Sequence, residues 1–242
     1  SRQQEAVETN YQFVDSRTLL SKLPDDVRTH ACPVLMPLRH VAWAGNMNNC
    51  FIAAYGYGTA LTAAATFHSM DHLGVAQYLT RLGLALDEPG VLEAGKNDWL
   101  GDPRWQVLRR HVEDTLVLKD PMEIFVAQNL ALDGLLYPLI YGAFIDDHLA
   151  IRGGTAIAML TGFMPEWHDE TVRWIDAVVK AAAAESPDNK TLITGWAKTW
   201  GDRAMAALAP VAEIALGAQG QVALASVRAD YDARCKKAGL EA

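Results

Sequence analysis

The chain has 242 residues, of which 50% are hydrophobic, so it is long and apolar enough to bury a substantial core in one large domain. A formal net charge of −8, without any run of Lys or Arg, argues against nucleic acids and anionic membrane surfaces as partners. The three cysteines are odd in number and far apart, which argues against a disulfide framework or a zinc knuckle and predicts a reducing cytoplasm.

Helical spacing of apolar residues dominates the first half of the chain. Residues 2–23 predict an amphipathic helix. A second helix over residues 25–55 is expected to end or kink at Pro33 and Pro37, because each proline removes an amide donor. Apart from Tyr57 and Leu61, residues 56–66 are all Gly, Ala or Thr, so two helices can approach closely there. A third helix is predicted to continue to Leu86 and to end at the Asp-Glu-Pro-Gly sequence of residues 87–90.

The second half of the chain contains sequence signals for helix starts. Asp102 followed by Pro103 predicts a cap and a first-turn proline for a helix that reaches residue 116. Residues 155–184 predict one long helix with a kink at Pro165, and residues 191–216 and 222–235 are also helical in pattern. No strand alternation or Gly-rich phosphate loop is found. The sequence therefore predicts an all-α fold, with a single domain over residues 1–242.

The most apolar run of the chain covers residues 124–145, directly after a helix start. Asp120 can cap this helix, Pro121 suits its first position, and Glu123 is placed to complete a capping box. The run is long enough to cross a bilayer. Burial inside a helical protein is nevertheless the favoured interpretation, because the first half of the run carries polar residues that would be costly in lipid.

Those polar residues are Gln128, Asn129 and Asp133, and on a core helix they need partners. Two interpretations stay open for them. The favoured one is a hydrogen-bond network between helices, and the other is a current or former metal site.

A helix-borne di-iron site was tested by its usual spacing, in which two helices each supply Glu-x-x-His. None of the seven histidines has Glu or Asp three residues before it, so this site cannot be built in the usual way. The Asp71-His72 pair is interpreted as a surface or helix–helix contact. No nucleophile elbow or dinucleotide fingerprint is present, so the residues offer no catalytic centre.

Several short segments together carry a resemblance to a known family. They are Pro37-Leu38-Arg39-His40-Val41 with Asn46-Met47-Asn48-Asn49, Met70-Asp71 with Leu73-Gly74 and Gln77-Tyr78-Leu79, Val112-Glu113-Asp114-Thr115-Leu116-Val117, Gln128-Asn129 with Asp133-Gly134 and Tyr137-Pro138-Leu139, and Glu170 with Arg173-Trp174. The chain resembles the beta (small) subunits of the hydroxylase component of soluble bacterial multicomponent di-iron monooxygenases, with phenol hydroxylase the nearest.

The resemblance implies a ferritin-like (ribonucleotide-reductase-like) long-helix bundle that has lost the metal site of its catalytic relatives. Catalytic subunits carry Asp-Glu-x-Arg-His-x-Gln. When this pattern is aligned on Asp71 and Gln77, the Glu place is His72 and the His place is Val75. Neither catalytic residues nor metal ligands are therefore expected in this chain.

A second copy of the pattern keeps an acid at Glu170 but has Arg173 where the His would stand, and Gln128 or Asn129 falls near another ligand place. We expect Arg173 to pair with a buried Glu170 and so to replace the charge of the metal, since an unpaired buried charge is costly. The resemblance also implies that an N-terminal arm of the family is missing before Ser1.

As partners, the resemblance implies a catalytic alpha subunit that holds the di-iron centre, a gamma subunit, and two αβγ protomers in the complex. A small regulatory protein and a reductase with NADH, FAD and an iron-sulfur cluster would act transiently, without nucleic acid or membrane. The implied reaction inserts one oxygen atom of O2 into phenol or a related aromatic, in the cytoplasm.

Three alternatives stay open. The chain could be the beta subunit of a toluene, alkene or propane monooxygenase, a stand-alone ferritin-like di-iron oxidase, or a free-standing helical protein with a small-molecule pocket. A large exposed apolar patch would favour a scaffold subunit over a free-standing protein.

Overall fold

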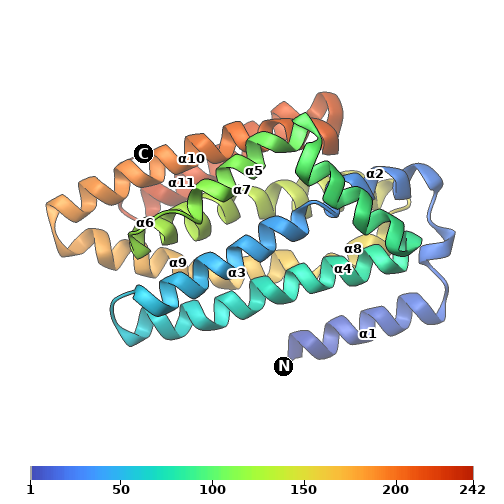
Figure 1. Cartoon of the computed structure of the whole chain (residues 1–242), viewed down its shortest axis with the longest axis horizontal. Coiled ribbons are helices and arrows are strands. Elements are labelled where there is room, and N and C mark those ends of the chain that lie inside the picture. The colour runs from blue at the N-terminus through green and yellow to red at the C-terminus, as the bar shows by residue number, and fades with distance from the viewer. Residues whose placement is uncertain (1, 242) are drawn as a thin grey trace.

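The computed structural model describes residues 2–241, apart from the side chains of residues 2–4 and 87–89, and all regular structure in this range is helical (Figure 1). The α-helices are α1 (Arg2–Ser16), α2 (Asp25–Leu35), α3 (Leu38–Tyr55), α4 (Thr59–Gly101), α5 (Pro103–Thr115), α6 (Pro121–Phe125), α7 (Asp133–Tyr137), α8 (Thr155–Thr161), α9 (Phe163–Glu185), α10 (Pro187–Leu216) and α11 (Gly220–Lys237). Short 3-10 turns are η1 (Leu20–Lys22), η4 (Ala150–Arg152) and η5 (Gly217–Gln219), and η2 (Val126–Leu132) and η3 (Pro138–Leu149) are π-helical. The all-α prediction is confirmed.

The long helices run along the length of the molecule and pack as antiparallel neighbours (Figure 1). Helix α3 pairs with α4, and α10 packs against α5, α9, α11 and η2. The continuous helical stretch Pro121–Arg152, here called the central helix, combines α6, η2, α7, η3 and η4 and lies between these layers. This architecture is the ferritin-like bundle that was expected.

The central helix is the core element predicted from its apolar run. Two helical stretches, Pro121–Arg152 and Pro187–Lys237, are long and apolar enough to cross a membrane, and 94% of the apolar window in the first is buried inside the fold. The π-helical segments widen this helix on both sides of α7. Such segments are rare and frequently accompany functional sites. The polar residues of this helix lie here, Gln128 and Asn129 within η2 and Asp133 at the start of α7.

The helix starts predicted at Asp102 and Asp120 are confirmed. The Asp102 side chain accepts from the Arg104 amide, and the Asp120 side chain accepts from the amides of Met122 and Glu123. The capping box is not formed as expected, since Glu123 Oε1 accepts a hydrogen bond from Trp200 Nε1 at 3.0 Å. The carboxylate therefore links the central helix to α10.

Helix breaks lie at or near the prolines that were predicted to cause them. Residues 25–55 form two helices that separate around Pro37, while Pro33 lies inside α2. In the predicted helix over residues 155–184, the break lies at Gly162 rather than at Pro165. Pro165 occupies the first turn of α9, where an amide has no intrahelical partner to lose.

The predicted end of the third helix at residues 87–90 is wrong, because α4 continues to Gly101. The helix is instead sharply bent. A Cβ on Gly83 would lie 2.7 Å from Leu92 Cδ2 and 3.3 Å from Val91 Cγ2, whereas residues eight or nine apart in a straight helix are about 12–14 Å apart. The fully buried Met36 sits inside the bend, against Gly83 and Gly95.

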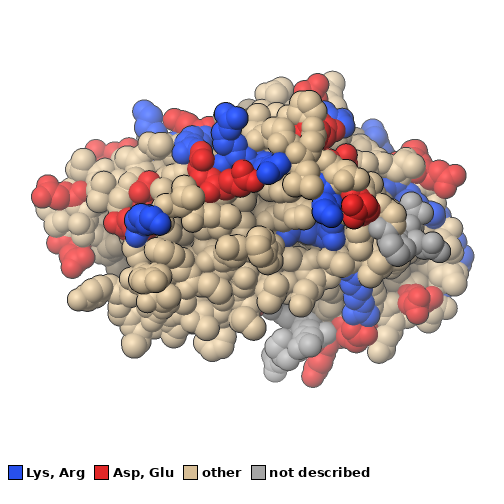
Figure 2. Space-filling model, viewed as in Figure 1, with Lys and Arg blue, Asp and Glu red and all other residues tan. Residues whose placement is uncertain are grey.

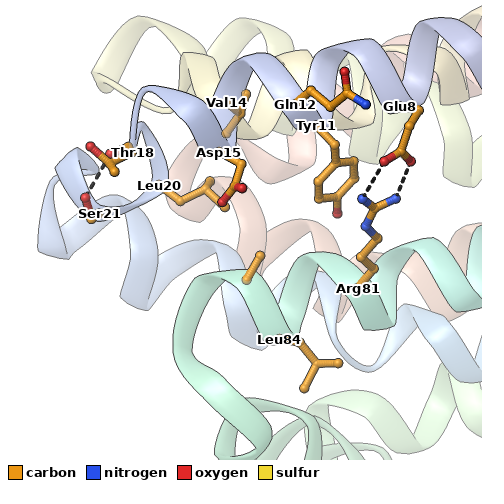
Figure 3. Close-up of a pocket in the computed structure, with 11 residues that line it drawn as sticks. Glu8, Tyr11, Gln12, Val14, Asp15, Thr18, Leu20, Ser21, Arg81 and Leu84 are labelled. Carbon is orange, nitrogen blue, oxygen red and sulfur yellow. Dashed lines mark hydrogen bonds and ion pairs between the residues drawn. The ribbon is translucent and has the colours of Figure 1, made fainter.

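Helix α1 lies on the outside of the bundle and is fixed to α4 by polar contacts (Figure 3). Arg81 forms two hydrogen bonds with Glu8, of 2.8 and 3.2 Å, and its guanidinium lies 3.7 Å from the centroid of the Tyr11 ring. Val14 is also buried. These contacts place α1 over the middle of α4.

Candidate functional site

A buried amide network joins α3, the end of α5 and the central helix. Asn48 Nδ2 donates to Thr115 Oγ1 at 2.8 Å and to Gln128 Oε1 at 2.9 Å, and Gln128 Nε2 donates to Asp133 Oδ1 at 2.9 Å. These residues are at most 3% exposed. The network predicted for the polar residues of the central helix is therefore present.

At the next residue along each helix, Asn49 and Asn129 form a reciprocal pair. Each amide nitrogen donates to the other residue's oxygen at 2.9 Å, and Asn49 also donates to the Gly45 carbonyl. Both asparagines are fully buried. Because each side chain supplies a donor and an acceptor to the other, the pair fixes the register of α3 against the central helix.

Next to the network, two histidines of α4 meet the one carboxylate of the core. His68 and His72 are four residues apart, and their ring centroids are 4.8 Å apart. His72 Nε2 lies 3.1 Å from Asp133 Oδ2. The donor atoms of all three residues lie within 4.8 Å of one another. Among the described residues, Asp133 is the only buried Asp, Glu, Lys or Arg.

The close approach of α3 and α4 depends on Gly45. A Cβ at this position would lie 2.6 Å from His72 Nδ1, so only glycine leaves room for the imidazole. Asp71, the neighbour of His72, faces outwards and accepts a hydrogen bond from Trp167 Nε1 at 3.0 Å. The Asp71-His72 pair is thus a helix–helix contact, as predicted, and its two members face different surroundings.

Two buried histidines near Asp133, His68 and His168, are held in the neutral form. Burial, with smaller contributions from His72 and His168, lowers the pKa of His68 well below its usual value. Burial and the nearby Arg234 lower the pKa of His168 to about 4. Neutral imidazole is the form that accepts a hydrogen bond or binds a metal.

Several polar atoms in this region lack a hydrogen-bond partner, namely His68 Nε2, both ring nitrogens of His72 and Asp133 Oδ2. His72 Nε2 and Asp133 Oδ2 are close but do not have the alignment of a hydrogen bond. Buried polar groups are almost always paired, so these atoms need an explanation.

The structure divides the residues predicted as lost-ligand positions into two sets. His72, Gln128 and Asn129 lie in the buried cluster, and Val75 is buried next to it. Glu170 and Arg173 are both exposed on α9. The prediction that Glu170 is a buried carboxylate is therefore wrong, because both residues lie on the outer face of α9.

Sequence reasoning missed the roles of His68, Asn48 and Asn49. The signal for His68 in the sequence is the spacing His-x-x-x-His, which places two imidazoles on one face of a helix. The Glu-x-x-His spacing of a di-iron site does not include this pair. The asparagines were noticeable only as polar residues on an apolar helix.

The cluster does not fit a di-iron centre. Such centres in bundles use four carboxylates and two histidines, whereas the cluster provides one carboxylate, Asp133, and two histidines. Val75 cannot bind a metal, and Gln128 is already hydrogen-bonded through both of its amide atoms. These residues could supply ligands to a single ion.

Comparisons with known proteins agree with the fold. The family model for methane/phenol/alkene hydroxylase matches residues 1–186. The chain is 44% identical over its whole length to the phenol 2-monooxygenase oxygenase component DmpL of Pseudomonas sp. (strain CF600), and 38% identical to the corresponding component MhpL of Acinetobacter pittii (strain PHEA-2). It covers 72% of each of these relatives.

Two further proteins extend the comparison. The structure of phenol hydroxylase from Pseudomonas sp. OX1 matches all of this chain and 73% of its own, with a TM-score of 0.93 and 38% identity. The beta subunit of the toluene-4-monooxygenase hydroxylase of Ectopseudomonas mendocina is 26% identical over 68% of this chain and 51% of its own length. The relatives are thus oxygenase components of phenol and toluene monooxygenases.

Proposed function

Because the chain belongs to the methane/phenol/alkene hydroxylase family, we propose that it is the non-catalytic beta subunit of a phenol-type monooxygenase hydroxylase. The complex would insert one oxygen atom of O2 into phenol or a related aromatic. The two relatives that match the whole chain at 44% and 38% identity are phenol 2-monooxygenase components, which supports phenol over toluene, alkene or propane as the substrate class.

In this proposal the chemistry resides in a catalytic alpha subunit with a di-iron centre. A gamma subunit completes each of two αβγ protomers, a small regulatory protein binds transiently, and a reductase with FAD and an iron-sulfur cluster delivers electrons from NADH in the cytoplasm. This chain would contribute one domain, residues 1–242, that supports the alpha subunit. It would carry no di-iron centre and no catalytic residue.

Cavity size supports a non-catalytic role. The cavity beside His72 and Asp133 has a volume of about 10 Å³ and is lined by apolar and aromatic side chains, Val75 and Tyr141 among them. Sites for small organic molecules are usually about 300–1,000 Å³. An aromatic substrate would not fit next to the buried polar cluster.

The observation that carries the scaffold proposal is the surface over α3 and the first half of α4. Between residues 41 and 80, Asp71 is the only Asp, Glu, Lys or Arg. This surface, the uncharged face, exposes six large apolar side chains, namely Trp43, Met47, Tyr55, Tyr57, Phe67 and Met70. Figure 2 shows few charges where Figure 1 places α3 and the start of α4. Large exposed apolar patches mark binding surfaces for other proteins.

An apolar groove of about 790 Å³ continues the uncharged face at the end of the bundle. It lies between the turn from α3 to α4, which carries Tyr57, and the hairpin of α9 and α10, which carries Trp174 and Trp196. Aromatic side chains are enriched in the centres of protein interfaces. The groove and the face together would accept a large subunit.

The test is co-purification with the larger di-iron subunit from the same cells. Phe67→Asp places a charge on the uncharged face, whereas Val222→Asp on α11 places one at a site with the same exposure, 73%. We expect Phe67→Asp to reduce capture of the partner by more than about tenfold, since a buried unpaired charge costs several kcal/mol, and Val222→Asp to leave it unchanged. Equal capture by the two variants would contradict the proposal.

A further inference from the structure

We propose that His68, His72 and Asp133 bind one divalent first-row transition-metal ion that joins α4 to the central helix. The sequence alone predicted no metal ligands in this chain, and the site emerges only when the two helices are packed together.

The geometry supports a site with two nitrogens and one oxygen. His68 and His72 project from successive turns of one face of α4, the arrangement by which two histidines four apart bind zinc. Asp133 reaches the same point from the central helix, with Oδ2 3.1 Å from His72 Nε2. Ligands of a tetrahedral ion are about 3.3–3.5 Å apart, since metal–ligand distances are about 2.0–2.2 Å. The largest separation in the cluster, at most 4.8 Å, then needs to shorten by up to about 1.5 Å.

An ion would explain several unsatisfied atoms at once. His68 Nε2, His72 Nε2 and Asp133 Oδ2 are buried without hydrogen-bond partners, and the three residues are 3%, 1% and 3% exposed. An ordinary contact between His72 and Asp133 would leave His68 without a role. A shared ion gives each of the three side chains a bond.

The surrounding residues already hold the ligands in place. Gln128 donates to Asp133 Oδ1, which leaves Oδ2 free for an ion, and Asn48 in turn fixes Gln128. The indole of Trp167 stacks on the His68 ring, with centroids 5.0 Å apart and an interplanar angle of 15°. Partners of this kind orient metal ligands in known sites.

The small cavity limits what the ion can do. It borders His72 and Asp133 and, at about 10 Å³, has room for about one water molecule as a further ligand. Two imidazoles and a carboxylate suit Zn²⁺, Fe²⁺ or Co²⁺ rather than Mg²⁺ or Ca²⁺. The ion would therefore stabilise the fold instead of acting on an organic substrate.

The experiment titrates the chain of residues 1–242, first stripped with a chelator, with Co²⁺ as a visible probe. We expect about one equivalent of Co²⁺ to bind, with d–d absorption bands typical of low coordination number. At a free ion concentration about 100 times Kd, the melting temperature should rise by about 5–10 °C. His68→Gln and Asp133→Asn should each lose the absorption bands and the shift in melting temperature.

His111→Gln is the matched control. His111 is equally buried, at 3% exposure, and both of its ring nitrogens lack partners, but it lies on α5 next to Trp200. This variant should bind Co²⁺ like the wild type. Absence of binding to the wild type at about millimolar Co²⁺, or unchanged binding in the His68 and Asp133 variants, would overturn the proposal.

If the variants fail to fold, a measurement on the wild type alone still tests the proposal. Nitrogen-15 spectra of labelled histidine rings should shift for two histidines when Zn²⁺ is added, while His111 keeps its signal. Shifts confined to the partly exposed histidines His30, His40 and His148 would also reject the site. None of these outcomes depends on capture of a partner subunit, so this proposal and the scaffold proposal can fail separately.

Discussion

His72 and Asp133 meet in the core of the bundle, with Nε2 3.1 Å from Oδ2, although one comes from α4 and the other from the central helix. Asp133 also accepts a hydrogen bond from Gln128, so a single carboxylate connects the histidine to the amide network. Removing it affects both neighbours. The relationship thus ties the stability of the fold to one buried acid.

Asp133→Ala should therefore destabilise the chain strongly. The substitution leaves Gln128 Nε2 without its acceptor, removes the carboxylate that faces His72 Nε2 and opens a cavity, which together cost about 2–4 kcal/mol. Asp133→Asn should cost less, because the amide oxygen can still accept from Gln128. Urea unfolding of the metal-free chain measures both free energies. Equal losses of unfolding free energy in the two variants would show that the hydrogen-bond acceptor at this position does not contribute to stability.

The contact of Gly45 with the His72 ring predicts an opposite effect for two glycine substitutions. Gly45→Ala should cost about 1–3 kcal/mol, because the new Cβ lies 2.6 Å from His72 Nδ1 and pushes α3 away from α4. Gly74→Ala should stabilise by about 0.5–1 kcal/mol, since this position inside α4 has nothing within 4 Å of the new Cβ.

Thermal and urea unfolding of the two variants check this prediction. Because both glycines lie inside helices, the gain in helix propensity is the same in each, and the difference between the variants reports the clash alone. If Gly45→Ala were as stable as Gly74→Ala, the close approach of α3 to His72 would be wrong.

Buried neutral histidines predict a loss of stability at acidic pH. Burial, followed by the charge of Arg203, lowers the pKa of His111 to about 4, and the unfolded side chain titrates near 6.5. The unfolded state therefore binds more protons between pH 6.5 and 4, so stability falls as the pH is lowered through this range. His111 contributes a loss of about 3 kcal/mol across it.

His111→Leu should flatten this dependence, because it removes the proton-binding group and keeps the volume. Urea unfolding at several pH values between 7 and 4 measures the slope. His168, whose pKa is also about 4, contributes a similar slope and should remain unaffected in the variant. An unchanged pH dependence in His111→Leu would mean that this histidine is not held neutral by the fold.

Local signals predicted much of the fold, because caps depend on neighbouring residues. Asp102 and Asp120 cap their helices as expected, and the apolar run after Asp120 is the buried core helix. The bend of α4 could not be predicted in this way. Its Asp-Glu-Pro-Gly sequence suggests a helix end, but Met36 from another part of the chain packs against Gly83 and Gly95 in the bend.

The candidate site shows the same limit. Polar residues on the central helix predicted that partners must exist, but their identity depends on how helices distant in sequence pack. His68 and Asp133 are brought together only by the packing of α4 against the central helix. The family pattern suggested a buried Glu170, yet both Glu170 and Arg173 are exposed on α9. A sequence pattern predicts where a residue lies along its helix. It does not predict which face of that helix the neighbouring helices cover.

The exposure of Arg173 leads to a last prediction, which contrasts two arginines that lie near α9. Arg173→Ala should change the free energy of unfolding by less than about 0.5 kcal/mol, as is usual for surface positions. Arg234→Ala should cost about 2–3 kcal/mol. The Arg234 side chain is 12% exposed, and its Nε donates to Asp176 Oδ1 at 2.6 Å, a charge-assisted bond that joins α11 to α9.

Urea unfolding of both alanine variants, with Arg234→Lys as a third, distinguishes the two positions. Lysine keeps the positive charge but cannot reproduce the guanidinium geometry, so Arg234→Lys should recover only part of the loss. A large cost for Arg173→Ala would restore the idea that this arginine replaces the charge of a lost metal. A small cost for Arg234→Ala would show that the Asp176 contact contributes little to the docking of α11 on α9.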